Sequence, residues 1–258
     1  MTDDFFEARA VPRRRGRGAG IALFVVVGLV LILAIIAVIA DFAARAYAED
    51  RAAKQITQSL PSTATGDVSV DIHGLSFLLQ AVTGTLDDVT LTSDDLVISG
   101  VPLDLDVDLA DVPLSSGGTT GPVSGTVTVG QDAVNALQAV KDTGGTVTLG
   151  AGEVTFDRTL DVPLLGSVPV KVVEKPALSE DGKTLTLTPT SASVPGSALA
   201  IDQPQILSAW AQNICLAQYL PSAVTLTGIT VAADDVTIAF RSDGLALSSS
   251  TFNQKGAC

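Results

Sequence analysis

The feature that most constrains this chain is an apolar run without a single charge, residues 20–40, close to the N-terminus. An α-helix of this length rises about 31 Å, which is enough to cross a hydrocarbon core of roughly 30 Å. A helix buried against a soluble domain carries a polar stripe on its outer face, and this run carries none. The run therefore predicts one transmembrane helix over residues 20–40.

Charges flanking this run predict the orientation of the chain. Residues 1–19 form a tail that contains five arginines, Arg9, Arg13, Arg14, Arg15 and Arg17. Basic flanks stay in the cytoplasm, so residues 41–258 are expected outside, held at the plasma membrane by a single pass. A cleaved signal peptide is the alternative, because Val38-Ile39-Ala40 resembles a cleavage site, although signal peptides have apolar regions of about 7–15 residues. The domain would then be secreted.

The remainder of the chain is strongly acidic. From Asp41 onward there are 25 acidic and 10 basic residues. Nucleic-acid binding requires a basic face, so no nucleic-acid partner is expected. About 218 residues suit one extracytoplasmic domain, residues 41–258.

Residue spacing predicts the elements of this domain. Residues 41–60 predict a helix that continues outward from the membrane, ends at Pro61 and docks on the domain through Phe42, Ala46, Ala53, Ile56 and Leu60. Further helix-like stretches are residues 131–141 and 203–214. From Val68 the apolar period changes to two, which is typical of antiparallel strands with one wet face. These strands include Val68/Val70/Ile72, Val101 to Leu109, Val147/Leu149, Val154/Phe156, Val168/Val170/Val172, Leu185/Leu187 and Val236/Ile238/Phe240.

Glycine and aspartate mark the expected turns. They lie at Gly144-Gly145, Gly150 to Gly152, Asp181-Gly182 and Asp243-Gly244, and the pairs Asp87-Asp88, Asp94-Asp95 and Asp234-Asp235 are also expected in turns. The expected fold class is α+β, with a curved antiparallel sheet wrapping helices, preceded by one transmembrane helix.

A weak repeat relates Leu86–Ile98 to Leu226–Ile238, with residues 147–156 as a looser third copy. It indicates either a duplication or the convergence of short hairpins.

The chain contains two cysteines, Cys215 and Cys258. Thiols outside the cytoplasm tend to oxidise, so a disulfide that ties the tail to the body is expected. Two unpaired thiols are the alternative.

Catalytic chemistry is scarce in the sequence. His73 is the single histidine and lies on the polar side of a strand, and the nucleophile-elbow, Walker, HExxH and S-x-x-K motifs are missing. Asp104, Asp106 and Asp108 could hold Ca²⁺, but side chains two apart on a strand are about 6.5–7 Å apart, which favours a solvated acidic face. We therefore expect no catalytic residue, no metal site and no cofactor.

Two apolar clusters interrupt the strand pattern. One is Leu75 to Gln80, and the other runs from Ile206 to Pro221. Either is ordinary core or the wall of an apolar groove. In the second case the lipid-contacting residues are Phe77, Leu78, Leu79, Trp210, Leu216, Tyr219 and Leu220.

A larger pattern resembles a known family. Its residues are Val68, Val70, Ile72, Gly74, Phe77, Leu78, Gln80, Gly84, Leu86 and Val89, followed later by Leu220-Pro221, Val224, Leu226, Ile229 and Val231. The pattern is similar to the actinobacterial DUF2993 family of LmeA-like phospholipid-binding proteins, over roughly residues 41–250. Ser76 replaces the proline that usually precedes Phe-Leu in that family.

The resemblance implies a tubular lipid-binding-like fold and a phospholipid ligand, with phosphatidylinositol or a lipid-linked glycan as candidates. It also implies a role in building the cell envelope, beside glycolipid-synthesis enzymes. Arg158, Lys171, Lys175 and Arg241 are the basic residues considered for an anionic headgroup. Two other functions stay open: a scaffold module with a filled core, and a carbohydrate-active enzyme with paired carboxylates about 5–9.5 Å apart.

The orientation gives the first testable prediction. A reporter that is active only in the cytoplasm, fused after Cys258, should be silent, because the arginine-rich tail holds the N-terminus inside. A second fusion of the same reporter at the N-terminus serves as the control and should be active. Activity of the C-terminal fusion would contradict the predicted orientation.

Overall fold

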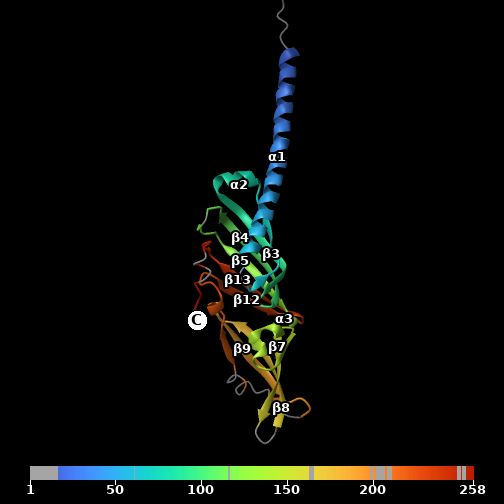
Figure 1. The fold of residues 1–258 in the computed structure, drawn as a ribbon, viewed down its shortest axis with the longest axis vertical. Helices are drawn as coiled ribbons and strands as arrows, with labels where there is room; N and C mark the ends of the chain where they lie inside the picture. Colours follow the sequence, from blue (N-terminus) through green and yellow to red (C-terminus); the bar gives the residue numbers. More distant parts are fainter. Residues whose placement is uncertain are drawn as a thin grey trace, which may run out of the picture. The chain divides into compact units, whose positions relative to one another are not determined.

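A computed structural model describes residues 17–60, 62–115, 117–162, 166–197, 200–201, 207, 211–248, 251 and 254–258 (Figure 1). The chain divides into two compact units, Met1–Ala44 and Arg45–Cys258.

The first unit holds the greater part of helix α1 (Arg17–Ser59). From Val26 onward this helix is long and apolar enough to cross a membrane. Its large apolar side chains between Val26 and Ile39 are each more than half exposed, as expected for side chains that face lipid. The helices predicted over residues 20–40 and 41–60 are therefore one continuous element, which ends two residues before Pro61 because proline disfavours helical geometry in the residue before it.

The end of α1, within the second unit, packs on a sheet. Its side chains Ala48, Ala52, Ala53 and Ile56 contact a buried cluster of Val70, Ile72, Leu86 and Val89. The backbone N–H of Ile72 also donates to Glu49 Oε1 at 2.9 Å. The docking of residues 41–60 is confirmed for Ala53 and Ile56, whereas Phe42 is 65% exposed.

The first antiparallel sheet has the order β1-β3-β4-β5-β13-β12, and Figure 1 shows its five longer strands. Strands β1 and β2 both pair with β3, at different positions along its length. Its strands are β1 (Ala64–Thr65), β2 (Ser69–Ile72), β3 (Thr85–Ile98), β4 (Val101–Pro113), β5 (Val123–Gly130), β12 (Thr225–Val231) and β13 (Asp235–Ser242). Three short helices accompany the sheets: α2 (Phe77–Thr83), α3 (Gln131–Ala136) and α4 (Gln138–Lys141). The last two match the helix predicted over residues 131–141.

The second antiparallel sheet has the order β10-β9-β8-β7-β6, with β11 also paired to β9. Its strands are β6 (Thr146–Gly150), β7 (Glu153–Val162), β8 (Gly166–Leu178), β9 (Thr184–Ser193), β10 (Ala200–Ile201) and β11 (Gln212–Cys215). Two backbone hydrogen bonds join the sheets at β12: Leu226 donates to Gly182 at 3.3 Å and Gly152 donates to Val231 at 2.8 Å.

The α+β class and the antiparallel strands of period two are confirmed, but the strands form two sheets where one was expected. The helix predicted over residues 203–214 is wrong at its end, where Gln212–Cys215 is strand β11. Most of the rest of that stretch lies outside the described residues.

The aspartate pairs show why local composition misleads. Asp87-Asp88 and Asp94-Asp95 lie inside β3, so the predicted turns are wrong there; the second pair sits at a register shift between Ser93 and Leu96. A bulge absorbs extra residues without ending a strand. Asp234, in contrast, lies in the β12–β13 connection and Asp235 begins β13. The two best copies of the repeat therefore differ in structure: one is a single strand and the other a hairpin.

Candidate functional site

The floor of the candidate site is a set of apolar side chains aligned by strand register. Leu105 in β4 lies opposite Val127 in β5, and Val127 lies opposite Ile238 in β13. Two residues further along β13, Phe240 pairs with Leu226 of β12. Because every second side chain of a strand points to the same face, Ile238 and Phe240 face the same side. Four strands thus present one continuous apolar surface.

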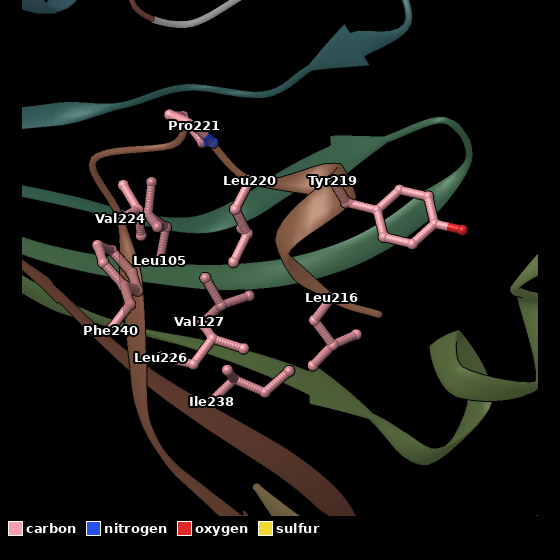
Figure 2. A pocket seen from close by; sticks show the side chains of 10 residues that line it. All are labelled: Leu105, Val127, Leu216, Tyr219, Leu220, Pro221, Val224, Leu226, Ile238 and Phe240. Carbon is pink, nitrogen blue, oxygen red and sulfur yellow. The ribbon is translucent and has the colours of Figure 1, made fainter. Parts of the chain in front are cut away.

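Residues 216–224 cross this surface and are here called the covering segment. The segment contains the 3₁₀ turn η2 (Ala217–Tyr219). Between the segment and the sheet lies an apolar hollow of about 370 Å³, lined by Leu105, Val127, Leu216, Tyr219, Leu220, Pro221, Val224, Leu226, Ile238 and Phe240. Figure 2 shows the aliphatic side chains of strands and segment directed toward one another, while the Tyr219 ring extends to one side.

The chemistry of the hollow is that of a hydrocarbon surface. The phenol oxygen of Tyr219 is the one polar atom among these lining side chains, and Tyr219 is 66% exposed. Most other lining residues are half-buried, so apolar surface is left accessible. The volume is at the lower end of the range for ligand pockets, about 300–1,000 Å³. A hollow lined in this way suits an apolar group.

The covering segment is fastened on both sides. The N–H groups of Leu216 and Ala217 both donate to the Lys183 carbonyl, at 2.9 and 3.1 Å. On the other side, two backbone hydrogen bonds join the segment to the C-terminal tail, residues 254–258. The Ser222 N–H donates to the Gln254 carbonyl at 2.8 Å, and the Gly256 N–H donates to the Leu220 carbonyl at 3.1 Å.

The predicted disulfide is confirmed and joins the residue before the covering segment to the C-terminal tail. Cys215 and Cys258 are bonded, with their Cα atoms 5.8 Å apart and a sequence separation of 43 positions. A crosslink closing a loop of this length contributes about 4 kcal/mol on the chain-entropy model. Since Cys215 directly precedes Leu216, the bond fixes the start of the covering segment to the end of the tail.

A cation lies beside the hollow. Lys255 Nζ donates to the backbone carbonyl oxygen of Tyr219 at 3.2 Å, which places an ammonium group at the backbone of a lining residue. The four basic residues considered from the sequence, Arg158, Lys171, Lys175 and Arg241, do not line the hollow. Lys171 instead pairs with Asp157 at 3.8 Å.

The residues predicted to contact lipid fall into three groups. Leu216, Tyr219 and Leu220 come together at the hollow. Phe77 packs against the core cluster beside α1, while Leu78 and Leu79 are exposed on α2, so these three do not line it. Trp210 lies outside the described residues.

Sequence reasoning placed Leu105, Ile238 and Phe240 on an apolar strand face but did not assign them to a site. It missed Val127, because β5 was not predicted, and Lys255, because a single lysine near a chain end carries no pattern.

Exposed Asp104, Asp132 and Asp234 line a second hollow, away from the apolar one. Glu174 in β8 is the one buried acidic residue in the described part of the chain, 7% exposed, and burial raises the pKa of its carboxyl. Asp104, Asp106 and Asp108 are exposed along β4.

Comparison with known proteins decides the family. The LmeA-like phospholipid-binding family matches residues 39–241, which include every residue that lines the hollow and both sheets except Ser242, the last residue of β13. The chain belongs to the LmeA-like phospholipid-binding family. No curated protein and no solved structure matches it. Within this LmeA-like chain, the hollow is the feature whose chemistry suits the apolar part of a phospholipid.

One glycine allows the floor of the hollow to form. A methyl group on Gly125 would lie 2.5 Å from the Asp106 carbonyl oxygen and 2.7 Å from Phe240 Cζ. Gly125→Ala should therefore lower the free energy of unfolding by about 1–3 kcal/mol, the usual cost of overpacking. Thermal unfolding measures this.

Gly228→Ala is the matched control, because a methyl group there meets nothing closer than Ala239 Cβ at 3.8 Å. Equal melting temperatures for the two variants would contradict the close approach of Phe240 to Gly125.

Proposed function

We propose that this protein is a membrane-anchored extracytoplasmic lipid carrier that holds the acyl part of a phospholipid in the apolar hollow and supports the building of the cell envelope. The observation that carries the proposal is the hollow itself, an accessible volume of about 370 Å³ whose lining is aliphatic and aromatic. A scaffold module would fill this space with its own side chains, since protein interiors pack to a density of about 0.74.

Burial of hydrocarbon supplies the affinity. Each buried methylene contributes about 0.8 kcal/mol, so about ten of them contribute about 8 kcal/mol. This gain opposes the entropic cost of association, about 4–15 kcal/mol. Burial of hydrocarbon is thus comparable in size to that cost without any special chemistry, and the remainder of the lipid stays outside the hollow.

The polar edge of the hollow suits a phosphate. Lys255 supplies a positive charge and Tyr219 an O–H donor, and both groups favour an anionic headgroup. Phosphatidylinositol and lipid-linked glycans carry such a phosphate. The lipid would be presented to envelope glycolipid-synthesis enzymes, and the protein itself would not be an enzyme.

The anchor completes the proposal. Residues 20–40 span the plasma membrane, residues 1–19 lie in the cytoplasm, and residues 41–258 form the lipid-binding domain outside. The exposed apolar side chains of α1 and the five arginines before Gly20 support this arrangement. Cleavage of the N-terminal segment would give the same domain in secreted form.

A charge inside the hollow should remove the lipid. Leu216→Asp places a carboxylate among the lining side chains, where its desolvation opposes binding of hydrocarbon. We expect the purified variant to lose at least about tenfold of its co-purified phospholipid, as measured by native mass spectrometry. Circular dichroism should show an unchanged fold, because Leu216 is only half-buried.

Ile214→Asp is the matched control, since Ile214 flanks Cys215 on its other side, is 36% exposed and does not line the hollow. It should keep its lipid. An unfolded Leu216→Asp variant, together with a parent protein that carries no lipid, would favour the scaffold function.

Loss of the cation should change which lipid is preferred. Lys255→Gln should weaken binding of a fluorescent anionic phospholipid by about two- to fivefold, as expected for one exposed charge pair, and should leave phosphatidylcholine binding unchanged. Lys175→Gln removes the same charge from the second sheet and should change neither affinity. Equal weakening of both lipids by Lys255→Gln would mean that Lys255 only supports the covering segment.

A further inference from the structure

Helix α2 and the residues beside it expose large apolar side chains. Leu75 is 103% exposed, Val82 86% and Leu79 64%. The cluster, here called the α2 apolar face, consists of Leu75, Leu78, Leu79, Val82 and Leu114. Leu114 joins the end of α2 because its N–H donates to the Gly84 carbonyl at 2.9 Å.

The opposite side of α2 holds this face in position. Phe77 packs against the core cluster beside α1. Gln80 is buried, and its side chain donates to the His73 carbonyl at 3.0 Å and accepts from the Asp87 N–H at 2.8 Å. With Phe77 and Gln80 turned inward, helical geometry directs Leu78, Leu79 and Val82 outward together. The exposure is therefore built into the fold.

An exposed apolar surface of this kind is expected to be covered by a partner or a membrane. Five large aliphatic side chains gathered in one place differ from scattered exposed leucines, which need no explanation, and mark a surface that contacts a partner or a membrane. Among the described residues, exposed Asp87 and Asp88 follow closely in β3. The face therefore favours hydrocarbon over a negatively charged partner.

The chain itself indicates which partner lies within reach. Arg45 Nη2 donates to the Gly74 carbonyl at 2.8 Å, directly before Leu75. Arg45 is five residues beyond Ala40, where the apolar run of α1 ends. Five residues span at most about 18 Å even when fully extended. Whatever the orientation of the two units, this contact keeps the start of the α2 apolar face close to the membrane surface.

We propose that the α2 apolar face inserts into the outer leaflet of the bilayer and forms a second membrane contact beside the anchor. The inference rests on the proposed membrane anchoring of α1. Interfacial apolar surfaces sink about 5–10 Å into the boundary between headgroups and acyl chains. Leu75 and Val82, the most exposed members of the face, enter the leaflet, and the domain is held at a fixed height and orientation over the lipid that it binds.

Depth-dependent quenching in the full-length protein tests the insertion. Both native cysteines are in the disulfide, so Val82→Cys takes a single NBD fluorophore. After reconstitution into phosphatidylcholine nanodiscs, nitroxide lipids labelled near the headgroup should quench this fluorophore. The same label at Leu137→Cys, an exposed leucine between α3 and α4, is the matched control and should be quenched little.

A second set of variants tests the apolar nature of the contact. With the fluorophore at Leu75→Cys, the double change Leu79→Asp and Val82→Asp should lower quenching by about tenfold or more, because each loss of a leucine-sized contact weakens burial by about that factor. All three positions are mostly exposed, so circular dichroism should be unchanged. Raising the salt concentration should leave quenching in the parent protein unaltered, since salt screens charges and not apolar contacts.

Three outcomes would overturn the inference. They are equal quenching at Val82 and Leu137, a fluorophore at Val82 that is shielded from water yet not quenched by nitroxide lipid, and quenching that disappears in high salt. Native mass spectrometry on the same samples keeps the two proposals apart. Bound lipid without quenching contradicts the second membrane contact alone, and quenching without bound lipid contradicts the proposed lipid-binding function alone.

Discussion

The structure depends on how one wide apolar sheet face is covered. Strand register gives β4, β5, β12 and β13 a shared apolar side, and water would be in contact with all of it if nothing lay across. The end of α1 covers one part and buries Val70 and Ile72. Leu245 covers the middle, where it packs against Val107, Leu109 and Val123. Residues 216–224 cross the remaining part without filling it, so the site exists where the cover is incomplete.

Periodicity is what allowed the sequence to predict so much of this fold. A period of two identifies strands and the face that each side chain occupies, and it placed Leu105 and Phe240 correctly on the apolar side. The sequence does not reveal which stretch of that face is covered by which segment, because covering depends on contacts between residues far apart. Strand β5 was not predicted because Gly125 interrupts the alternation of its apolar residues. The reason for that glycine, the close approach of Phe240, lies in another strand and is not visible in the local sequence.

The candidate site was predictable only where residues cluster along the chain. Leu216, Tyr219 and Leu220 form a local apolar group, and they do meet at the hollow. The local group at Phe77–Leu79 is also apolar and lies elsewhere, since hydrophobicity alone does not distinguish a ligand-facing side chain from one that packs in the core, as Phe77 does, or is exposed, as Leu78 and Leu79 are. The β3–β4 register places α2 beside Pro113, eight residues from Leu105, or about 26 Å along the strand.

The two walls of the hollow differ in how firmly they are held. Its floor is a hydrogen-bonded ladder across β4, β5 and β13, whereas the covering segment has a short 3₁₀ turn and is held by individual backbone bonds to Lys183 and to the C-terminal tail. Segments with few internal bonds open locally at a small fraction of the free energy of global unfolding. A guest can thus exchange by transient displacement of residues 216–224 while the sheet stays intact, and the crosslink at Cys215 makes that displacement a swing about one fixed end.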